Sequence, residues 1–179
     1  VVSHAHTIFL RTRAALWRSR DAGIAWEIVR GGIENEIVHA LLPDAFSPRL
    51  YAATGSGSVF ASDVDGAAWQ KFSKGLPSNA AALSLAQLNA DTVLAGTQTG
   101  IWITRDRGES WQAANAGIGA PPIHALALGA DGALFAATED GLYRAEASGN
   151  YGGVGNAALR VPILSIVRAP SDPQVMYAG

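Results

Sequence analysis

The sequence predicts an all-β fold made of repeated four-stranded units, and three observations support the prediction. An eight-residue pattern, Ser/Thr-x-Asp-x-Gly-x-x-Trp, recurs along the chain, and its tryptophans Trp26, Trp69 and Trp111 stand 43 and 42 residues apart. Short apolar runs bounded by Gly, Pro and Asn occupy the intervals between these patterns. A sustained helical period is absent from every segment. A period of roughly 40 to 50 residues, made of short strands, is typical of the blades of a β-propeller.

Each repeat unit contains four predicted strands in a fixed order. The first follows a connector that contains Gly or Pro, at residues 38–41, 83–85, 123–126 and 164–166. The second is an apolar run that ends in Thr, at residues 8–12, 50–54, 93–97 and 134–138. A turn leads to the third strand, which places an aromatic residue at the same position in each unit: Trp17, Phe60, Trp102 and Tyr143. The eight-residue pattern then reverses the chain into the fourth strand, as at residues 26–29 and 69–72.

The repeat predicts one domain over residues 1–179, a partial propeller with units at residues 8–32, 36–76, 82–118, 122–160 and 163–179. The first and last units are expected to be incomplete, because the runs at residues 8–12 and 175–179 both have the character of a second strand. About four blades are therefore expected here, as part of a larger propeller of roughly six or more blades.

The residues of the eight-residue pattern have structural roles in this interpretation. A short carboxylate in a turn accepts hydrogen bonds from nearby backbone N–H groups, and the Ser or Thr hydroxyl bonds the other side of the turn. Glycine adopts the positive φ that a tight reversal needs, and tryptophan buries a large area of the blade. The residues expected in these roles are Ser19, Asp21, Gly23 and Trp26; Ser62, Asp65, Gly66 and Trp69; and Thr104, Asp106, Gly108 and Trp111.

Two units depart from the pattern. In the second, Val64 stands where Asp is expected, and Asp65 is shifted by one position. In the fourth, the positions of Ser, Asp, Gly and Trp are taken by Ala145, Ala147, Gly149 and Gly152. A looser turn or an insertion is predicted there, over residues 149–155. Because individual blades differ at these irregular turns, they are the first places to look for function.

The composition excludes several classes of function. The chain has no Cys, which excludes disulfides, thiolate metal sites and cysteine nucleophiles. Its net charge of −2 comes from mixed acidic and basic residues, without the basic stripe of a nucleic-acid-binding protein. Its apolar runs are far shorter than the roughly 18 residues of a membrane span, and no cofactor is expected. The hydrophobic content of 49%, against 16% charged residues, suits sheets that pack on both faces.

The three octets resemble the Asp-box, also called the bacterial neuraminidase repeat. The longer unit is similar to the YVTN-like propellers of bacteria, including sortilin-like and photosystem II assembly-factor-like ones, and the resemblance extends over residues 8–179. It implies a propeller fold but no single activity, because the family contains binding proteins as well as sialidases and xyloglucan-cleaving hydrolases. It also favours a location outside the cytoplasm.

No catalytic residues are predicted. A sialidase would need an arginine cluster, a nucleophilic Tyr with a Glu partner and an acidic general acid. The nearest match to the Arg-Ile-Pro segment of sialidases, residues 160–162, lies in a connector after the last recognisable box. Other glycosidases would need two carboxylates across a groove. The carboxylates outside the boxes have the character of turn residues: Glu34, Glu36, Asp44, Asp91, Asp131, Glu139, Asp140 and Asp172.

Two sets of residues are candidates for binding. The first set occupies one place in the first strand of successive units, which lies innermost in a blade: His39, Ser84, His124 and Ser165. This set predicts a polar channel wall that is either simply hydrated or binds a small polar ligand or a metal, although metal sites usually have three or more ligands. The second set flanks the first and third boxes and either recognises acidic partners or forms a solvated turn face: Arg18, Arg20, Arg105 and Arg107.

The repeated motifs, without an unrepeated polar constellation, favour a non-catalytic propeller module. We expect it to bind a protein or glycan or to scaffold an assembly. The alternative is a fragment of a sialidase-like or xyloglucanase-like hydrolase whose catalytic residues lie mostly outside this chain.

Overall fold

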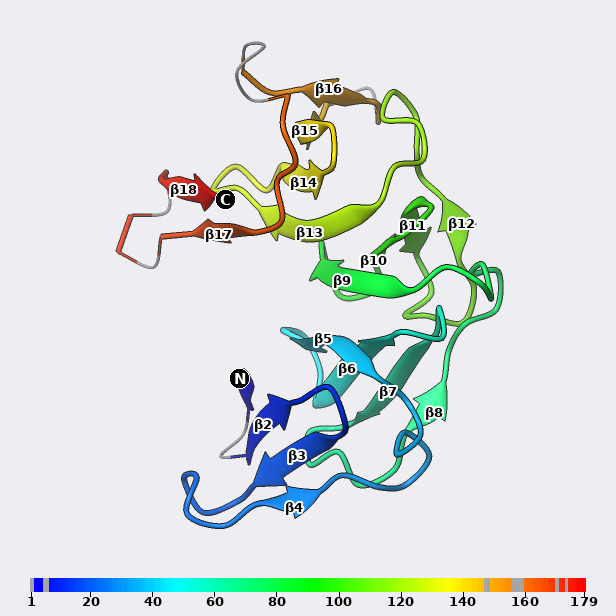
Figure 1. Cartoon of the computed structure of the whole chain (residues 1–179), viewed down its shortest axis with the longest axis vertical. Helices are drawn as coiled ribbons and strands as arrows, with labels where there is room; N and C mark the ends of the chain where they lie inside the picture. The colour runs from blue at the N-terminus through cyan, green and yellow to red at the C-terminus, as the bar shows by residue number, and fades with distance from the viewer. Residues whose placement is uncertain (1, 5–6, 147–148, 156–159, 170, 173) are drawn as a thin grey trace.

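The chain folds into five antiparallel sheets that follow one another along the sequence (Figure 1). The computed structural model describes residues 2–4, 7–146, 149–155, 160–169, 171–172 and 174–179. In this part of the chain the regular structure is β-strand throughout, and no helix is present. Four of the sheets have four strands and the fifth has two. The predicted all-β fold of propeller blades is confirmed.

The strands of each sheet lie side by side in chain order, so each sheet is a simple meander. The first sheet contains β1 (Val2–His4), β2 (Thr7–Arg11), β3 (Leu16–Ser19) and β4 (Glu27–Ile28). The second contains β5 (Val38–Pro43), β6 (Arg49–Thr54), β7 (Val59–Asp63) and β8 (Gln70–Lys71). The third contains β9 (Ala82–Gln87), β10 (Val93–Thr97), β11 (Gly100–Thr104) and β12 (Gln112–Ala113). The fourth contains β13 (Ile123–Leu128), β14 (Leu134–Thr138), β15 (Gly141–Ala145) and β16 (Tyr151–Gly153), and the fifth contains β17 (Ile166–Arg168) and β18 (Met176–Ala178).

The sheets are arranged around an open arc (Figure 1). Strands β5, β9, β13 and β17 lie along its inner side, whereas β4, β8, β12 and β16 lie on its outer side. Neighbouring first strands contact one another in turn, from β1 through β5, β9 and β13 to β17. The first strand of each unit is thus innermost, and a ligand in the middle of the arc would meet these strands.

The core is divided among the junctions between successive sheets. In β6, Leu50 packs with Phe9 and Trp69 between the first and second sheets. Its neighbour Tyr51 packs with Trp111 between the second and third sheets. Because side chains alternate across a strand, each middle sheet contributes one face to each of two junctions. Burial on both faces explains the high hydrophobic content of the sequence.

Two strands lie outside the predicted strand ranges. β1 pairs with β2, so the first sheet begins before residue 8 and has four strands. The sequence favours an edge strand at this end of the chain, around His4, but the predicted unit bounds of 8–32 leave it out of the first sheet. β16 falls within residues 149–155, where a looser turn or an insertion was expected. Ala147, part of that expectation, lies outside the described residues.

Candidate functional site

Bulges on the inner strands change the ring of residues that was expected there. His39 and His124 are each the unpaired residue of a bulge, in β5 and β13. In β9 the unpaired residue is Leu83, so Ser84 comes one place later than the two histidines. At the start of the fifth sheet, the backbone N–H groups of Leu164 and Ser165 both donate to the carbonyl of Gly179, so Ser165 is likewise the second of two residues that face one. A bulge adds one residue to a strand, and this shift explains why equal spacing in the sequence does not give equal positions.

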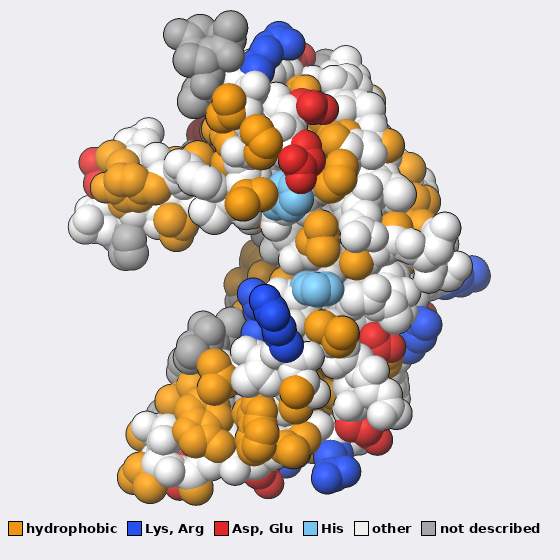
Figure 2. All heavy atoms as spheres, viewed as in Figure 1, with side chains coloured by type: hydrophobic (Ala, Val, Ile, Leu, Met, Phe, Trp, Pro, Cys, Tyr) orange, Lys and Arg blue, Asp and Glu red, His pale blue; other side chains and the backbone are white. Residues whose placement is uncertain are grey.

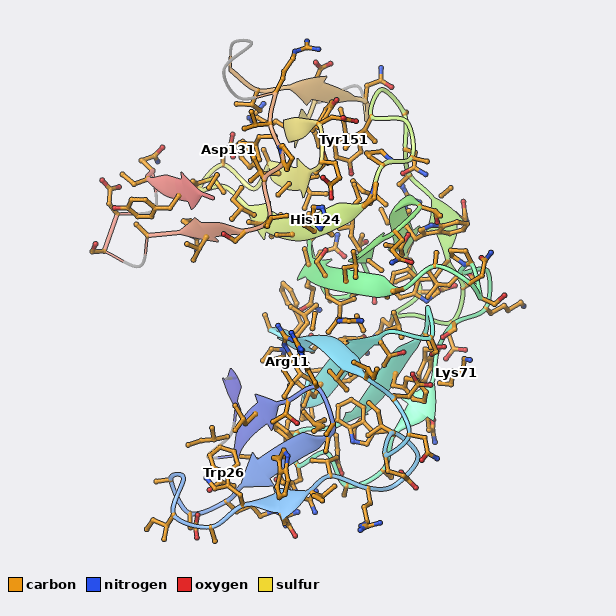
Figure 3. The ribbon with its side chains drawn as sticks, in the orientation of Figure 1. Arg11, Trp26, Lys71, His124, Asp131 and Tyr151 are labelled. Carbon is orange, nitrogen blue, oxygen red and sulfur yellow. The ribbon has the colours of Figure 1, made fainter. Side chains whose placement is uncertain are left out.

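The two histidines belong to β5 and β13 on the inner side of the arc, and Figure 2 shows imidazole side chains at the surface of this hollowed face. His124 Nε2 lies 2.9 Å from Glu139 Oε1. The pKa of His39 is lowered by burial and by the positive charge of Arg11, which Figure 3 places at the inner side of the arc. Among the described residues, no group of three or more His, Cys, Asp or Glu could hold a metal. The inner face therefore has two separate polar spots.

The two serines of the expected ring use their hydroxyls to donate hydrogen bonds to backbone carbonyls. Ser84 is buried, and its hydroxyl donates to the carbonyl of Ile123 at 3.4 Å. The hydroxyl of Ser165 donates to the carbonyl of Gly179 at 3.3 Å. Both hydroxyls thus bond the backbone of neighbouring strands, and the polar channel wall stays a prediction.

The third box turn, between β11 and β12, is closed by its own polar side chains. The hydroxyl of Thr104 donates to Asp106 Oδ1 at 2.6 Å and accepts from the backbone N–H of Gly108 at 2.9 Å. Asp106 also accepts from the hydroxyl and the backbone N–H of Ser110, at 2.5 and 2.9 Å. These bonds, led by that of the Ser110 hydroxyl, lower the pKa of Asp106 from 3.8 to about 2.

The first box turn, between β3 and β4, has the same arrangement. The hydroxyl of Ser19 donates to Asp21 Oδ1 at 2.7 Å and accepts from the backbone N–H of Gly23 at 2.8 Å. Asp21 accepts from the backbone N–H of Ala25 at 2.9 Å, and this bond is the main cause of its lowered pKa. The box glycines Gly23, Gly66 and Gly108 have φ of 92°, 64° and 102°, a region that L side chains rarely adopt.

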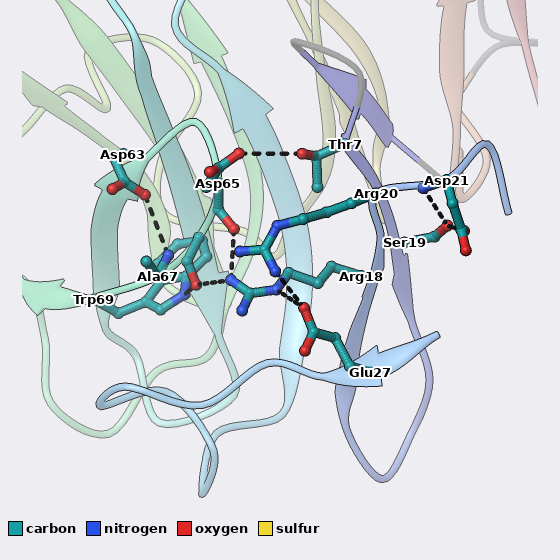
Figure 4. Close-up of polar contacts among 11 residues, drawn as sticks. Thr7, Arg18, Ser19, Arg20, Asp21, Glu27, Asp63, Asp65, Ala67 and Trp69 are labelled. Carbon is teal, nitrogen blue, oxygen red and sulfur yellow. Dashed lines mark hydrogen bonds and ion pairs between the residues drawn. The ribbon is translucent and has the colours of Figure 1, made fainter. Parts of the chain in front are cut away.

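The second box turn, between β7 and β8, uses a different carboxylate from the expected one (Figure 4). Asp63 Oδ1 accepts from the backbone N–H of Ala67 at 3.1 Å, and the hydroxyl of Ser62 lies 3.4 Å from the same oxygen. Asp65, expected in this role, instead accepts from the hydroxyl of Thr7 in the first sheet at 3.3 Å. The reason is spacing, because Asp63 accepts a hydrogen bond from the backbone N–H of the residue four places later, as the box carboxylates do in the other two turns.

The box tryptophans pack against the sheet that precedes their own. Trp69 and Trp111 are 5% and 4% exposed. The indole N–H of Trp69 donates to its own turn, at the carbonyl of Gly66, whereas that of Trp111 donates to the carbonyl of Phe72 in the second sheet. Trp26, in the first sheet, is 38% exposed. The burial of these side chains thus depends on the sheet next to them.

Tyr151 takes the place of the box tryptophan in the fourth sheet. Its backbone N–H donates to the carbonyl of Ala116 at 2.8 Å, as those of Trp69 and Trp111 do to their preceding units. Burial raises the pKa of its phenol to about 12. Gly152, expected at this place from the spacing, lies one residue later because the decayed turn is shorter by one residue.

The arginines that flank the boxes differ in their partners. Arg18 and Arg20 both pair with Glu27, at 2.7 and 2.6 Å. Arg107 reaches into the second sheet, where it donates to the hydroxyl of Ser47 at 2.8 Å. Arg105 is exposed and forms no side-chain hydrogen bond or ion pair with any residue that the structure describes.

A buried polar cluster joins the second and third sheets; we call it the 2–3 clamp, and it consists of Asp44, Ser47, Gln87 and Arg107. The fully buried Asp44 side chain accepts from Ser47 at 2.6 Å and from Gln87 at 2.8 Å, and it lies 3.7 Å from the Arg107 guanidinium. Burial acts to raise the pKa of Asp44, but the hydrogen bonds outweigh it, so this pKa is lowered.

The third and fourth sheets share a packed core, and an open space lies beside it at their junction, which we call the 3–4 cleft. Leu88 is the residue of the third sheet that is equivalent to Asp44 of the clamp. In each case the backbone N–H donates at 2.9 Å to a carbonyl at or just before the start of the second strand and so closes the loop between the first two strands. The cleft has a volume of about 490 Å³, within the range of ligand sites. Its lining includes Leu88, Leu94, Ile103, Arg105, Ala114, Asp131, Leu134, Arg144, Glu146 and Tyr151.

The 3–4 cleft combines an apolar floor with a charged rim. Leu94 and Tyr151 are buried, whereas Leu88 is 38% exposed. At the rim, Asp131 pairs with Arg144 at 2.5 Å. The backbone N–H of the hairpin and this guanidinium lower the pKa of Asp131. Figure 3 shows Asp131 and Tyr151 in the fourth unit of the arc. Apolar lining with a few fixed polar groups is typical of a binding site.

Arg105 and Asp131 stand out in the sequence, but no sequence pattern connects them with Leu88. Repeat alignment carries a signal for Leu88: the equivalent loop positions are Asp44 and Gly129, and an exposed leucine among them is unusual. The meeting of these residues in one cleft depends on how the sheets pack, which the sequence pattern does not contain.

Comparison with solved structures agrees with the fold. The extracellular domain of a one-component system from B. thetaiotaomicron has a TM-score of 0.79 at 15% identity, over 98% of this chain and 25% of that one. The GH74 xyloglucanase from Xanthomonas campestris has a TM-score of 0.73 at 16% identity, over 97% and 33%. YCF48 from Cyanidioschyzon merolae has a TM-score of 0.64 at 17% identity, over 93% and 57%. The chain thus spans part of each of these proteins, and the similarity concerns the fold alone.

Sequence comparison identifies the family. No curated protein matches the chain. None of the described segments forms a helix that could cross a membrane. The family model of sortilin, neurotensin receptor 3, matches residues 14–123. This match covers more than half of the residues, and the chain belongs to the Sortilin-Vps10 family.

Proposed function

We propose that this chain is a non-catalytic propeller module that binds a protein or glycan ligand in the 3–4 cleft. The observation that carries the proposal is that this cleft opens at the junction where the box pattern has decayed. Where the box is kept, its polar side chains bond their own turn or the neighbouring sheet. A feature that breaks a repeat is a better candidate for function than one that recurs in every unit.

The charges of the cleft suit binding better than glycoside hydrolysis. A general acid in a glycosidase needs a raised pKa, so that it carries its proton at the working pH. The pKa of Asp131 is lowered instead. Glu146 is the other carboxylate that lines the cleft. A fragment of a hydrolase is the second candidate function, and the similarity of fold to GH74 enzymes favours it.

A paired screen tests the proposal. The protein is applied to a glycan array and to a random-peptide display library, and the same glycans are assayed for hydrolysis. We expect selective binding without turnover. Ala114→Phe is the variant that fills the cleft. The equivalent residue of the second sheet is Phe72, so a phenylalanine is compatible with this position. The two residues are equivalent because the backbone N–H of each donates, at 2.8 Å, to the third strand of its own sheet. The variant should weaken binding by about tenfold or more.

Lys71→Ala provides the matched control, since Lys71 is an exposed residue of β8 away from the 3–4 cleft (Figure 3). It should bind as the wild type does. Undiminished binding by Ala114→Phe would contradict the assignment to the cleft. Turnover of any glycan that disappears in Asp131→Asn or Glu146→Gln would replace the binding module by the hydrolase.

A further inference from the structure

The charged residues of the 3–4 cleft differ in whether their side chains have a partner. Asp131 and Arg144 pair with each other at 2.5 Å. Glu146 has an interaction of its own. Arg105 has no side-chain partner among the residues that the structure describes, whereas the other three arginines beside the boxes form ion pairs. The rim of the cleft therefore presents one guanidinium with unused donors.

Part of the apolar surface of the cleft is also not covered by another side chain. Leu88 is 38% exposed at a loop position where the second sheet has the buried Asp44. Behind it, Leu94 and Tyr151 form a floor that is buried by the two sheets. An apolar surface of this kind beside an unpaired cation fits a ligand that brings both an apolar group and an anion.

We propose that the 3–4 cleft holds an extended protein segment in which an apolar side chain stands next to an Asp or Glu. This inference rests on the proposed function and names its ligand. The apolar side chain covers Leu88 and enters the cleft, while the carboxylate accepts two parallel hydrogen bonds from the Arg105 guanidinium. A neutral glycan would leave Arg105 unpaired. Such a glycan would also find no exposed aromatic face among the described lining residues, because Tyr151 is 7% exposed.

Short peptides test the ligand class directly. Hexapeptides with acetylated and amidated ends carry a central Leu-Asp, Leu-Asn, Leu-Lys or Ser-Asp pair between glycines, so the Asp side chain is their one anion. Binding is measured by isothermal titration up to millimolar peptide. We expect Leu-Asp to bind about tenfold or more tightly than the other three, because both the apolar contact and the charge-assisted bonds are needed. Equal affinities, or no binding of Leu-Asp, would overturn the inference.

Charge reversal tests the role of Arg105. Arg105→Glu should change the preference from Leu-Asp to Leu-Lys, and Leu88→Ser should weaken Leu-Asp by about tenfold without changing the charge preference. Lys71→Glu makes the same charge change outside the cleft and should leave every affinity unchanged. Both cleft positions are exposed, so the variants should fold, which circular dichroism checks. A preference for Leu-Asp that survives Arg105→Glu would overturn the inference.

The two proposals fail in different ways. If Ala114→Phe blocks a glycan from the screen while no peptide binds, the cleft is a binding site but its ligand class is wrong. If Ala114→Phe affects neither glycans nor peptides, the proposed function fails as well.

Discussion

Asp106 shows what an Asp-box turn requires of a single residue. Its carboxylate accepts from the backbone N–H four residues later, and the bonded atoms belong to one turn. Asp63 makes the same bond with the same spacing, although it stands one place before the box position. The requirement is therefore a carboxylate four residues before a free N–H, with a hydroxyl beside it, and this requirement is met locally, whatever the neighbouring sheets do.

Replacing Asp106 with Asn should make the stability of the protein less dependent on pH. The pKa of Asp106 is about 2 in the folded chain against an ordinary 3.8, so its contribution is present above the ordinary pKa and is lost as the pH falls through about 2. In thermal unfolding followed by circular dichroism, the variant should melt below the wild type at neutral pH. The two curves should converge as the pH falls toward about 2.

Asp91→Asn is the control for this measurement. Asp91 is exposed, and its carboxylate accepts no hydrogen bond from the described residues. Its replacement should leave the melting temperature unchanged at every pH. A difference between Asp106→Asn and the wild type that stays constant with pH would contradict the role assigned to the carboxylate.

At the scale of the element, the β9–β10 hairpin needs glycine at position 96, because there is no space there for a side chain. Gly96 pairs with Ser84, directly beside the bulge. A Cβ at this position would lie 2.3 Å from Ser84 Oγ and 2.6 Å from Ile123 Cγ2 in the next sheet. The inner ends of the third and fourth sheets thus approach each other closely over the backbone of β10.

We expect Gly96→Ala to lower the free energy of unfolding by about 1–3 kcal/mol, because the added methyl group overpacks this junction. Denaturant unfolding measures the change. Gly153→Ala is the matched control in β16, since a Cβ there meets no atom within 4 Å. A Gly96→Ala variant as stable as the control would show that β9 moves aside at little cost, contrary to this prediction.

The elements that could be predicted from the sequence are those with local causes. The second strands and the box turns follow from runs and spacings within a few residues, such as Thr104 to Trp111. Spacing alone does not reveal that His39 lies in a bulge and Ser84 one place after one, and it does not reveal Tyr151 because the fourth turn is one residue short. The 3–4 cleft could not be predicted, because Leu88 and residues of the fourth unit come to line one space only through the packing of two sheets.

At the scale of the whole molecule, the arc has two end sheets whose apolar faces are uncovered. In the first sheet, Trp26 is 38% and Ile28 is 40% exposed. In the fifth sheet, Val167 is 58% and Tyr177 is 63% exposed. At the middle junctions, a neighbouring sheet covers residues of this kind, as the first sheet does for Trp69, which is 5% exposed. The part of a larger propeller that was expected, with six or more blades, stays a prediction.

We expect the 179-residue chain to self-associate with rising concentration, because these two faces remove apolar area from water when they meet. Analytical ultracentrifugation measures this association. Val167→Lys together with Tyr177→Ser should weaken it, whereas Lys71→Ala should not. A compact monomer at all concentrations, with one cooperative unfolding transition, would contradict the prediction and the larger propeller.

The unequal junctions also have a mechanical consequence. Between the second and third sheets, the buried Asp44 and the partly exposed Arg107 join the two sheets across their junction. Between the third and fourth sheets, Leu88 stands in that place beside an open volume of about 490 Å³. Among the described residues no ion pair joins the third and fourth sheets, and their shared core of packed side chains holds them together instead. Because residues of both sheets line the 3–4 cleft, a ligand seated there would contact both at once and would tie together two neighbours that no ion pair of the described residues joins.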